Sequence, residues 1–276
     1  MIQISSVSKS YGNSVVVDDV TINLQPGGIT SIVGANGAGK STLLSMIARL
    51  LHLDSGSITV GGLDVATTDS MELARTLGIL KQDNGLQIRL TVHDLVSYGR
   101  YPHSRGRLKA ADHEAIEAAL DHMDLHDLRD RFLDEMSGGQ RQRAFVAMLL
   151  AQDTKYLLLD EPLNNLDMAH ALAMLQRLRR AADDLGKTIV MVVHDINFAS
   201  AWSDHIVAMK DGKVVLQGAP MDVVDSAMLS DVFGVNCAVD KASGCPIAQY
   251  YMPSAVSTTR REGAARHVVR AGHGLD

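Results

Sequence analysis

Hydrophobic residues along the chain fall into short apolar runs separated by stretches of helical periodicity. Runs at 29–34 (ITSIVG), 155–162 (KYLLLDEP) and 188–195 (TIVMVVHD) are typical of strands buried on both faces of a sheet. Residues 41–51 and 171–186 place apolar side chains at helical spacing, and the second segment ends in a glycine. The alternation predicts an α/β protein whose mostly parallel core sheet is covered by helices.

Short strands are predicted near the N-terminus, and two hairpins are predicted further along the chain. Residues 3–7 and 14–24 are expected to be strands, and the turn sequence QPGG follows the second. Residues 55–65 and 205–218 are expected to form hairpins, the latter turning at Asp211-Gly212.

A helical region is predicted in the middle of the chain. Residues 66–81 are expected to return to the sheet through a helix and a strand, and from about 88 to 150 the sequence becomes helical. The clearest helix is 111–125. We interpret this region as a helical subdomain inserted into one domain, residues 1–253. Residues 254–276 are small, polar and arginine-rich, and are predicted to be a disordered tail.

The composition is that of a globular protein without a nucleic-acid footprint. The 276 residues carry a net charge of -6 and are 46% hydrophobic, with no long basic run. The N-terminus lacks the apolar region of a signal peptide, and runs such as 144–151 are too short to span a bilayer. These features predict a cytosolic protein that does not cross a membrane, and they are compatible with docking on a membrane protein. Cys237 and Cys245 fit no zinc spacing; we interpret them as inert thiols, with a metal pair or a disulfide as alternatives.

A glycine-rich turn carries the clearest chemistry. Residues 34–41, GANGAGKS, fit the pattern G-x-x-x-x-G-K-[ST] between a predicted strand and a predicted helix. In this pattern backbone N–H groups close on phosphate oxygens, assisted by the helix dipole. Lys40 is expected to reach the β- and γ-phosphates, and Ser41 to bind Mg²⁺.

Polar residues end three further predicted strands. Asp160 and Glu161 follow a buried strand; Asp160 is the expected outer partner of Mg²⁺, and Glu161 the general base that polarises the attacking water. His194 and Gln82 end the other two strands. Because open parallel sheets bind ligands at the carboxyl ends of strands, all four residues are expected at one edge. Taken singly, each could also be a solvated or partly buried residue at a strand end.

A second phosphate-binding turn is predicted at residues 136–140, MSGGQ. The serine and the two glycines precede an Arg/Gln-rich helix, which is how a chain builds an anion-binding helix start. A glycine-rich turn between helices is the alternative.

Together these motifs resemble the nucleotide-binding subunit of ABC transporters over roughly residues 1–250. They occur in the family's order: GANGAGKS, Gln82, MSGGQ, LLLDEP, NNLD (164–167) and His194. The resemblance implies a P-loop NTPase fold of ABC type, with a mostly parallel core sheet, an antiparallel β-subdomain and an inserted helical subdomain. It also implies that Glu161 and His194 are catalytic. The implied nucleotide-binding residues are Tyr11 (stacked on adenine), Gly34, Ala35, Asn36, Gly37, Ala38, Gly39, Lys40, Ser41, Thr42, Gln82 and Asp160. The implied Mg²⁺ ligands are Ser41, Gln82 and, through water, Asp160.

The resemblance further implies head-to-tail pairing of two subunits around ATP. Ser137, Gly138, Gly139 and Gln140 of one subunit would then cover the γ-phosphate held by Lys40 of the other. Two departures from the family pattern stand out. Met136 replaces the usual leucine, a volume-conserving change. NNLD replaces the commoner small-residue version of that loop, so the role of Asp167 carries over more securely than the roles of its neighbours.

The stretch SYGRYPHSRG (97–106) resembles the subunits that serve iron-siderophore, haem and cobalamin import, and MSGGQRQRAFVAMLLAQ resembles the iron-chelate members best. The expectation is therefore a peripheral subunit on the cytoplasmic face of the membrane. It would pair as a homodimer, dock on transmembrane permease subunits through helices between about 88 and 135, and receive ferric siderophore indirectly from an extracytoplasmic binding protein. Haem or cobalamin import, a soluble ABC ATPase in repair or translation, and an ATP-binding regulator are the alternatives.

Overall fold

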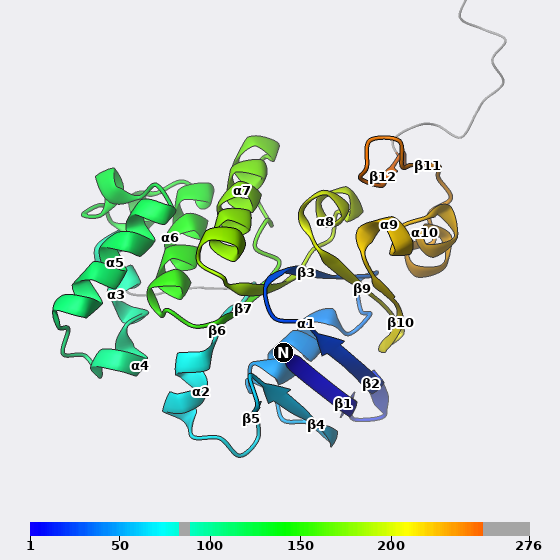
Figure 1. Ribbon diagram of the computed structural model, residues 1–276, viewed down its shortest axis with the longest axis horizontal. Coiled ribbons are helices and arrows are strands. Elements are labelled where there is room, and N and C mark those ends of the chain that lie inside the picture. Colours follow the sequence, from blue (N-terminus) through cyan, green and yellow to red (C-terminus); the bar gives the residue numbers. More distant parts are fainter. Residues whose placement is uncertain (83–88, 251–276) are drawn as a thin grey trace, which may run out of the picture.

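The structure is a computed structural model that describes residues 1–82 and 89–250 (Figure 1). Its strands are β1 (Ile2–Tyr11), β2 (Ser14–Leu24), β3 (Gly28–Val33), β4 (Ser55–Val60), β5 (Leu63–Asp64), β6 (Leu77–Leu80), β7 (Tyr156–Asp160), β8 (Thr188–Val192), β9 (His205–Lys210), β10 (Lys213–Gly218), β11 (Val239–Asp240) and β12 (Ile247–Ala248). Its α-helices are α1 (Lys40–Ile47), α2 (Ser70–Thr76), α3 (Val92–Tyr98), α4 (Tyr101–Ser104), α5 (Ala110–His122), α6 (Gly138–Ala151), α7 (Met168–Asp184), α8 (Ile196–Trp202), α9 (Pro220–Val223) and α10 (Ser226–Phe233), with short 3-10 turns at His126–Leu128 and Leu133–Glu135.

The core is a six-stranded sheet with the order β10-β9-β3-β8-β7-β6. All neighbouring strands in it are parallel except β9 and β10, which form the predicted hairpin. Asp211 and Gly212 both have positive φ, as a tight two-residue hairpin turn requires. The prediction of a mostly parallel core sheet is confirmed.

Strand alternation divides the apolar residues of this sheet between two cores. On β7, Leu157 and Leu159 face a cluster shared with α3, α5, α6 and α7, whereas Leu158 faces a cluster shared with α1 and the N-terminal strands. Strand β8 divides in the same way, with Ile189 on the first side and Val190 on the second. Because both faces are covered, the strands need apolar residues at every position, which is the pattern seen in the sequence.

The N-terminal strands form a separate antiparallel sheet with the order β2-β1-β4-β5. Helix α1 lies between this sheet and the parallel one and contacts β2, β4, β7 and β8 (Figure 1). The N-terminus of α1, which follows the glycine-rich turn, is thereby fixed between two sheets.

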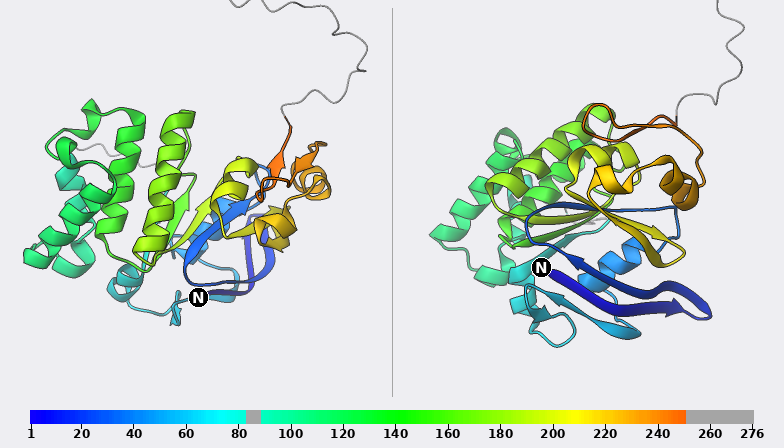
Figure 2. Two further views of the ribbon diagram at one scale, coloured as in Figure 1. Left: turned by 45° about the horizontal axis from the view of Figure 1, so that its top comes forward. Right: turned by 45° about the vertical axis from the view of Figure 1, so that its right-hand side comes forward.

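Helices α3 to α6 lie in the connection between the adjacent strands β6 and β7. Both views of Figure 2 show them together at one end of the molecule, away from the antiparallel sheet. The predicted tail, 254–276, lies outside the described residues.

The predicted helix at 41–51 is too long. Helix α1 ends at Ile47 because Arg49 adopts a left-handed conformation, φ +57°, and Leu50 N–H bonds back to the Ser45 carbonyl. The Arg49 guanidinium bonds instead to the Val65 and Thr68 carbonyls. Conversely, α7 begins at Met168, three residues before the predicted start, because Asp167 caps it by accepting from His170 N–H.

The C-terminal elements α8 to α10 and the β11-β12 pair were not predicted. Their apolar side chains pack with Val33, Ile206 and Ala208 into a third core cluster, and Cys237 is packed against it. Cys237 and Cys245 are free, half-buried thiols.

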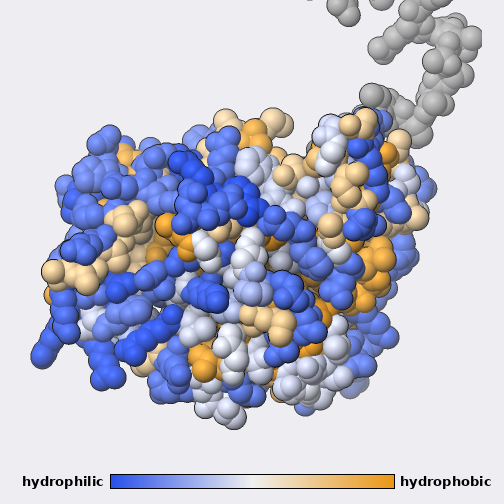
Figure 3. Space-filling model, in the orientation of Figure 1, coloured by the Kyte–Doolittle hydropathy of each residue, from blue (hydrophilic) through white to orange (hydrophobic). Residues whose placement is uncertain are grey.

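Among the described residues, no helix is both long enough and apolar enough to cross a bilayer. On the face drawn in Figure 3, hydrophilic residues predominate and apolar ones form small scattered groups.

Candidate active site

The glycine-rich turn links β3 to α1, and two of its glycines are required by close packing. A Cβ on Gly34 would lie 2.2 Å from the Met209 carbonyl oxygen, and one on Gly39 would lie 2.4 Å from that of Val16. Gly39 also has φ +93°, a conformation that favours glycine. Ala35, Asn36 and Gly37 are exposed, whereas Ala38 and Gly39 are buried. The turn therefore presents open backbone on a rigid base.

Lys40 folds back over this turn. Its Nζ donates to the carbonyl oxygens of Gly34 and Ala35, each at 2.8 Å, and the residue is only 5% exposed. Burial lowers the pKa of Lys40, while the nearby charges of Glu161 and Asp160 act in the opposite direction. The ammonium group is thus held where phosphate oxygens would approach the turn.

Ser41 and Asp160 form the link between the turn and the end of β7. Ser41 Oγ donates to Asp160 Oδ1 at 2.8 Å. Asp160 is buried, and this burial raises the pKa of its carboxyl group; the neighbouring Glu161 adds to the rise, and the Ser41 hydrogen bond partly offsets it. A desolvated carboxylate beside a hydroxyl is a donor set of hard oxygens, which suits Mg²⁺. Thr42 lies half-buried in the first turn of α1.

Glu161 follows Asp160 directly and contacts the end of β8. Its Oε1 lies 2.6 Å from His194 Nε2, and its Oε2 accepts from Asn164 Nδ2. The Glu161 side chain is 9% exposed and that of His194 is 40% exposed. The structure therefore brings Lys40, Ser41, Asp160, Glu161 and His194 to one edge of the sheet, as the strand order predicts.

The second glycine turn starts α6. Ser137 Oγ accepts from Gln140 N–H at 3.2 Å, and Gln140 Oε1 accepts from Ser137 N–H at 3.1 Å, a complete capping box. A Cβ on Gly139 would lie 3.0 Å from His170 on α7, so glycine permits this close approach. A Cβ on Gly138 would have no other atom within 4 Å. Within the described part of the chain, no hydrogen bond or ion pair joins residues 137–140 to residues 34–42, so a single chain leaves the two turns separate.

Tyr11 and Gln82 lie on the surface. Tyr11 ends β1, is 53% exposed and has Lys9 Nζ 6.0 Å from its ring centroid. Gln82 is exposed and follows β6, the strand beside β7. No hydrogen bond joins Gln82 to Ser41 or Asp160 among residues 1–82 and 89–250.

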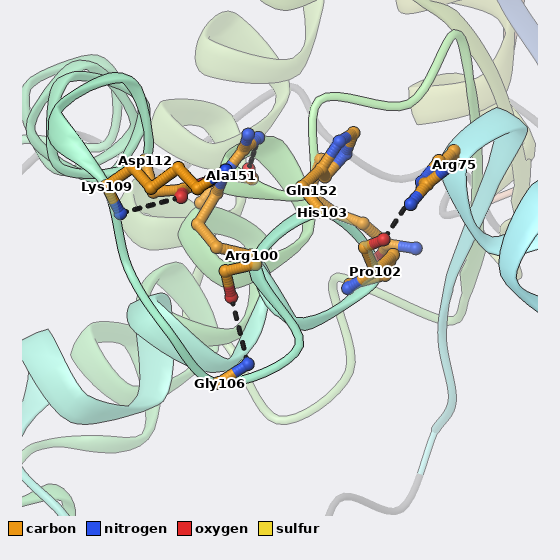
Figure 4. A network of polar contacts seen from close by, with 10 residues as sticks. Arg75, Arg100, Pro102, His103, Gly106, Lys109, Asp112, Ala151 and Gln152 are labelled. Carbon is orange, nitrogen blue, oxygen red and sulfur yellow. Dashed lines mark hydrogen bonds and ion pairs between the residues drawn. The ribbon is translucent and has the colours of Figure 1, made fainter.

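The stretch around 97–106 holds a buried polar network that sequence reasoning missed (Figure 4). Arg100 Nε donates to Asp112 Oδ1 at 2.9 Å, and Arg100 Nη1 donates to the Ala151 carbonyl at 2.8 Å. Both ionic side chains are less than a tenth exposed. From α2, Arg75 donates to the Pro102 carbonyl. The network ties α4 to α5, α6 and α2, while Tyr98 and Tyr101 stay exposed beside it.

The comparisons with known proteins agree with this geometry. The family model described as "ABC transporter" matches residues 17–164. The petrobactin import ATP-binding protein YclP of Bacillus subtilis (strain 168) is 48% identical over 251 residues, covering 91% of this chain and 100% of the relative. This chain belongs to the ABC transporter family. The petrobactin import ATP-binding protein FatE of Bacillus anthracis is 50% identical, with coverage of 91% and 100%.

A solved ABC cassette supports the fold. The dimeric structure of a post-hydrolysis state of an ATP-binding cassette, bound to ADP and Pi, matches with a TM-score of 0.70 and 28% identity, covering 79% of this chain and 98% of that one. The expected ABC-type P-loop fold is therefore confirmed. As a member of this family, the chain is an ABC ATPase that binds ATP.

Two residues at the candidate site were given no role of their own from the sequence. Asn164 contacts Glu161, and His170 contacts both Asp167 and the region of Gly139. The signal for Asn164 was present, because NNLD departs from the family's usual small-residue loop. His170 carried no signal of its own.

The charge on Asp160 is expected to reduce the stability of the nucleotide-free chain. Because burial raises its folded-state pKa above the unfolded value of 3.8, the ionised carboxylate opposes folding at neutral pH, and this penalty vanishes below pH 3.8. Asp160→Asn should therefore raise the thermal unfolding midpoint by a few degrees at neutral pH, and not in acid. Thermal denaturation at both pH values measures this.

Asp112→Asn is the matched control, because the Lys109 N–H and then Arg100 lower the pKa of Asp112. That variant should unfold at a lower temperature than the parent at neutral pH. A lower midpoint for Asp160→Asn as well would contradict the expectation.

Proposed function

We propose that this chain is the ATP-hydrolysing subunit of an importer for ferric siderophore. The observation that carries the ATPase part is the joining of Lys40, Ser41, Asp160, Glu161 and His194 at one sheet edge. The cargo part rests on the relatives, since YclP and FatE are named for petrobactin import and match over nearly their whole length.

The proposed roles of the site residues combine their positions with the family resemblance. The exposed turn at 35–37 and the ammonium of Lys40 bind the phosphates of ATP, and the N-terminus of α1 adds its dipole. Glu161 takes the proton of the attacking water. His194, half-exposed next to Glu161, contacts the γ-phosphate. Tyr11, exposed at the end of β1, stacks on adenine.

The residues present fit Mg²⁺. Ser41 and Asp160 offer adjacent hard oxygen atoms, and a cation offsets the cost of the buried Asp160 carboxylate. Ser41 and Gln82 would hold the ion directly and Asp160 through water. When bound, Mg²⁺ supplies charge neutralisation between the β- and γ-phosphates.

ATP is proposed to bridge two copies of the chain. The capped turn at 137–140 is preformed, yet it makes no polar contact with the phosphate loop of its own chain in the described residues. Head-to-tail pairing would place Ser137, Gly138, Gly139 and Gln140 over the γ-phosphate bound by the other copy. Hydrolysis would loosen this bridge and allow the pair to open.

The partner on the membrane is proposed to be a permease dimer that docks on the helical region. Tyr98 and Tyr101 are 57% and 56% exposed on a segment made rigid by the Arg100 network. Exposed aromatic side chains on a rigid base are typical of protein interfaces. In this arrangement the subunit is peripheral on the cytoplasmic face, and an extracytoplasmic binding protein delivers the chelate to the permease.

The test is radio-iron siderophore uptake in cells whose native copy is replaced by the Glu161→Gln form. Uptake of haem and cobalamin is measured alongside in the same cells. We expect ferric siderophore uptake to be lost, with petrobactin included among the chelates, because hydrolysis no longer resets the importer.

The parallel uptakes separate the parts of the proposal. Loss of haem or cobalamin uptake alone would overturn the assignment of ferric siderophore as cargo, but not the assignment of the chain to an importer. Unchanged uptake of all three in cells without another copy of the subunit would overturn the importer.

A further inference from the structure

Both carboxylate oxygens of Glu161 are occupied by protein donors. His194 Nε2 lies 2.6 Å from Oε1, and Asn164 Nδ2 donates to Oε2. With 9% of its side chain exposed, Glu161 is largely withdrawn from solvent. A general base must accept a proton from water within hydrogen-bond reach, so its partners decide whether it can act.

The chain between Glu161 and Asn164 is a tight turn that returns the amide to the carboxylate. Glu161 has φ +54°, and Asn164 N–H donates to the Glu161 carbonyl oxygen at 3.2 Å. Pro162 is buried and Leu163 packs against the main core cluster, so the turn is anchored from within. Asn164 is the turn's polar side chain that meets Glu161.

A cavity next to the Glu161 carboxylate leaves room for a second orientation of that side chain. A cavity of about 120 Å³ is lined by Glu161, Asn164 and His194, with Val193 and Phe198 among its apolar walls. A volume of this size holds a few water molecules. The Glu161 carboxylate therefore lies at the wall of this cavity, where Asn164 hydrogen-bonds to its Oε2.

We propose that Asn164 is a positioning residue that restrains Glu161 in the resting subunit, and that this hydrogen bond breaks before Glu161 accepts the proton of the attacking water. The inference rests on the proposed role of Glu161 as base. His194 is exposed enough to exchange Glu161 for a phosphate, whereas the Asn164 side chain hydrogen-bonds only to Glu161 among the described residues. The restraint therefore limits turnover without affecting how ATP is bound.

The test uses the purified full chain with the substitution Asn164→Ala. We expect kcat for basal ATP hydrolysis to rise about tenfold with KM for ATP unchanged, since a hydrogen bond to a charged group is lost. Asn164→Gln keeps an amide donor, so its kcat should lie between that of the parent and that of Asn164→Ala. Asn236→Ala is the matched control: Asn236 is exposed in the loop after α10 and makes no side-chain hydrogen bond to any described residue.

A second readout reports the contact without relying on catalysis. Carbodiimide labelling of Glu161 with glycine ethyl ester, followed by mass spectrometry, should proceed faster in Asn164→Ala than in the parent or in Asn236→Ala. Unchanged labelling would overturn the restraint. Faster labelling together with a lower kcat in Asn164→Ala would overturn the proposal that the Asn164 hydrogen bond limits turnover.

Glu161→Gln, measured in the same series, separates this inference from the proposed function. If that variant hydrolyses ATP at the parent rate, the role of Glu161 as base fails. The labelling rate of Glu161 in Asn164→Ala still decides whether the contact exists.

Discussion

Replacing Glu161 with glutamine is expected to lower kcat for ATP hydrolysis by about 100-fold or more, with ATP still bound. Glutamine keeps the size of the side chain and can still contact His194, but it cannot accept a proton. Lys40, Ser41 and the phosphate loop are untouched, so the dissociation constant for ATP should change little. Phosphate release at saturating ATP and equilibrium binding of a fluorescent ATP analogue measure the two quantities.

A surface glutamate provides the control for this loss of charge. Glu72 is exposed in the first turn of α2, so Glu72→Gln should hydrolyse ATP at the parent rate. Turnover by Glu161→Gln within a few-fold of the parent would show that another group takes the proton.

Removal of the buried Arg100 side chain is expected to cost about 3 kcal/mol of unfolding free energy. Asp112 would lose its ionic partner while remaining buried, and the Ala151 carbonyl would lose its donor. Urea denaturation of Arg100→Ala measures the change. Arg129→Ala removes a half-exposed pair with Glu117 and should cost less than about 1 kcal/mol.

A double substitution tests whether the unpaired charge causes the loss. Arg100→Met combined with Asp112→Leu replaces the ion pair by apolar side chains and should recover much of the stability. If the double variant is as unstable as Arg100→Ala, packing rather than charge accounts for the effect.

The Arg100–Asp112 pair should also make the unfolding free energy depend on pH. The Lys109 N–H and then Arg100 lower the pKa of Asp112 from 3.8. Stability from a lowered carboxylate pKa is fully present above the unfolded value and is lost as pH falls through the folded value. The difference between the parent and Arg100→Ala should therefore shrink below pH 3.8.

Residues whose position follows from a strand or from a local motif could be predicted. Asp160 and His194 end apolar runs, so parallel pairing alone brings them together. Ser137 and Gln140 have capping-box spacing and make that contact. The roles carried over from the family stay predictions, and Tyr11 and Gln82 contact none of the other site residues described.

The contact between Arg100 and Asp112 could not be predicted. Arginine and aspartate usually lie on the surface, and this pair is buried because Arg100, at the start of α4, meets Asp112 on α5 and the Ala151 carbonyl at the end of α6. The ends of α1 and α7 depended on the left-handed Arg49 and on the Asp167 cap. The C-terminal elements were missed because their short apolar segments form a core only with β3 and β9.

The connection between β6 and β7 decides where the helical region is attached to the sheet. Because these strands are parallel neighbours, the chain leaves the sheet near Leu80, on the edge that holds Glu161, and returns at Tyr156 on the opposite edge. At that return point Gln152 Nε2 donates to the Ala74 and Leu77 carbonyl oxygens. The end of α6 is therefore tied to α2 and to the start of β6 at the edge of the sheet opposite Glu161, so a displacement of α6 would be passed to the strand that Gln82 follows.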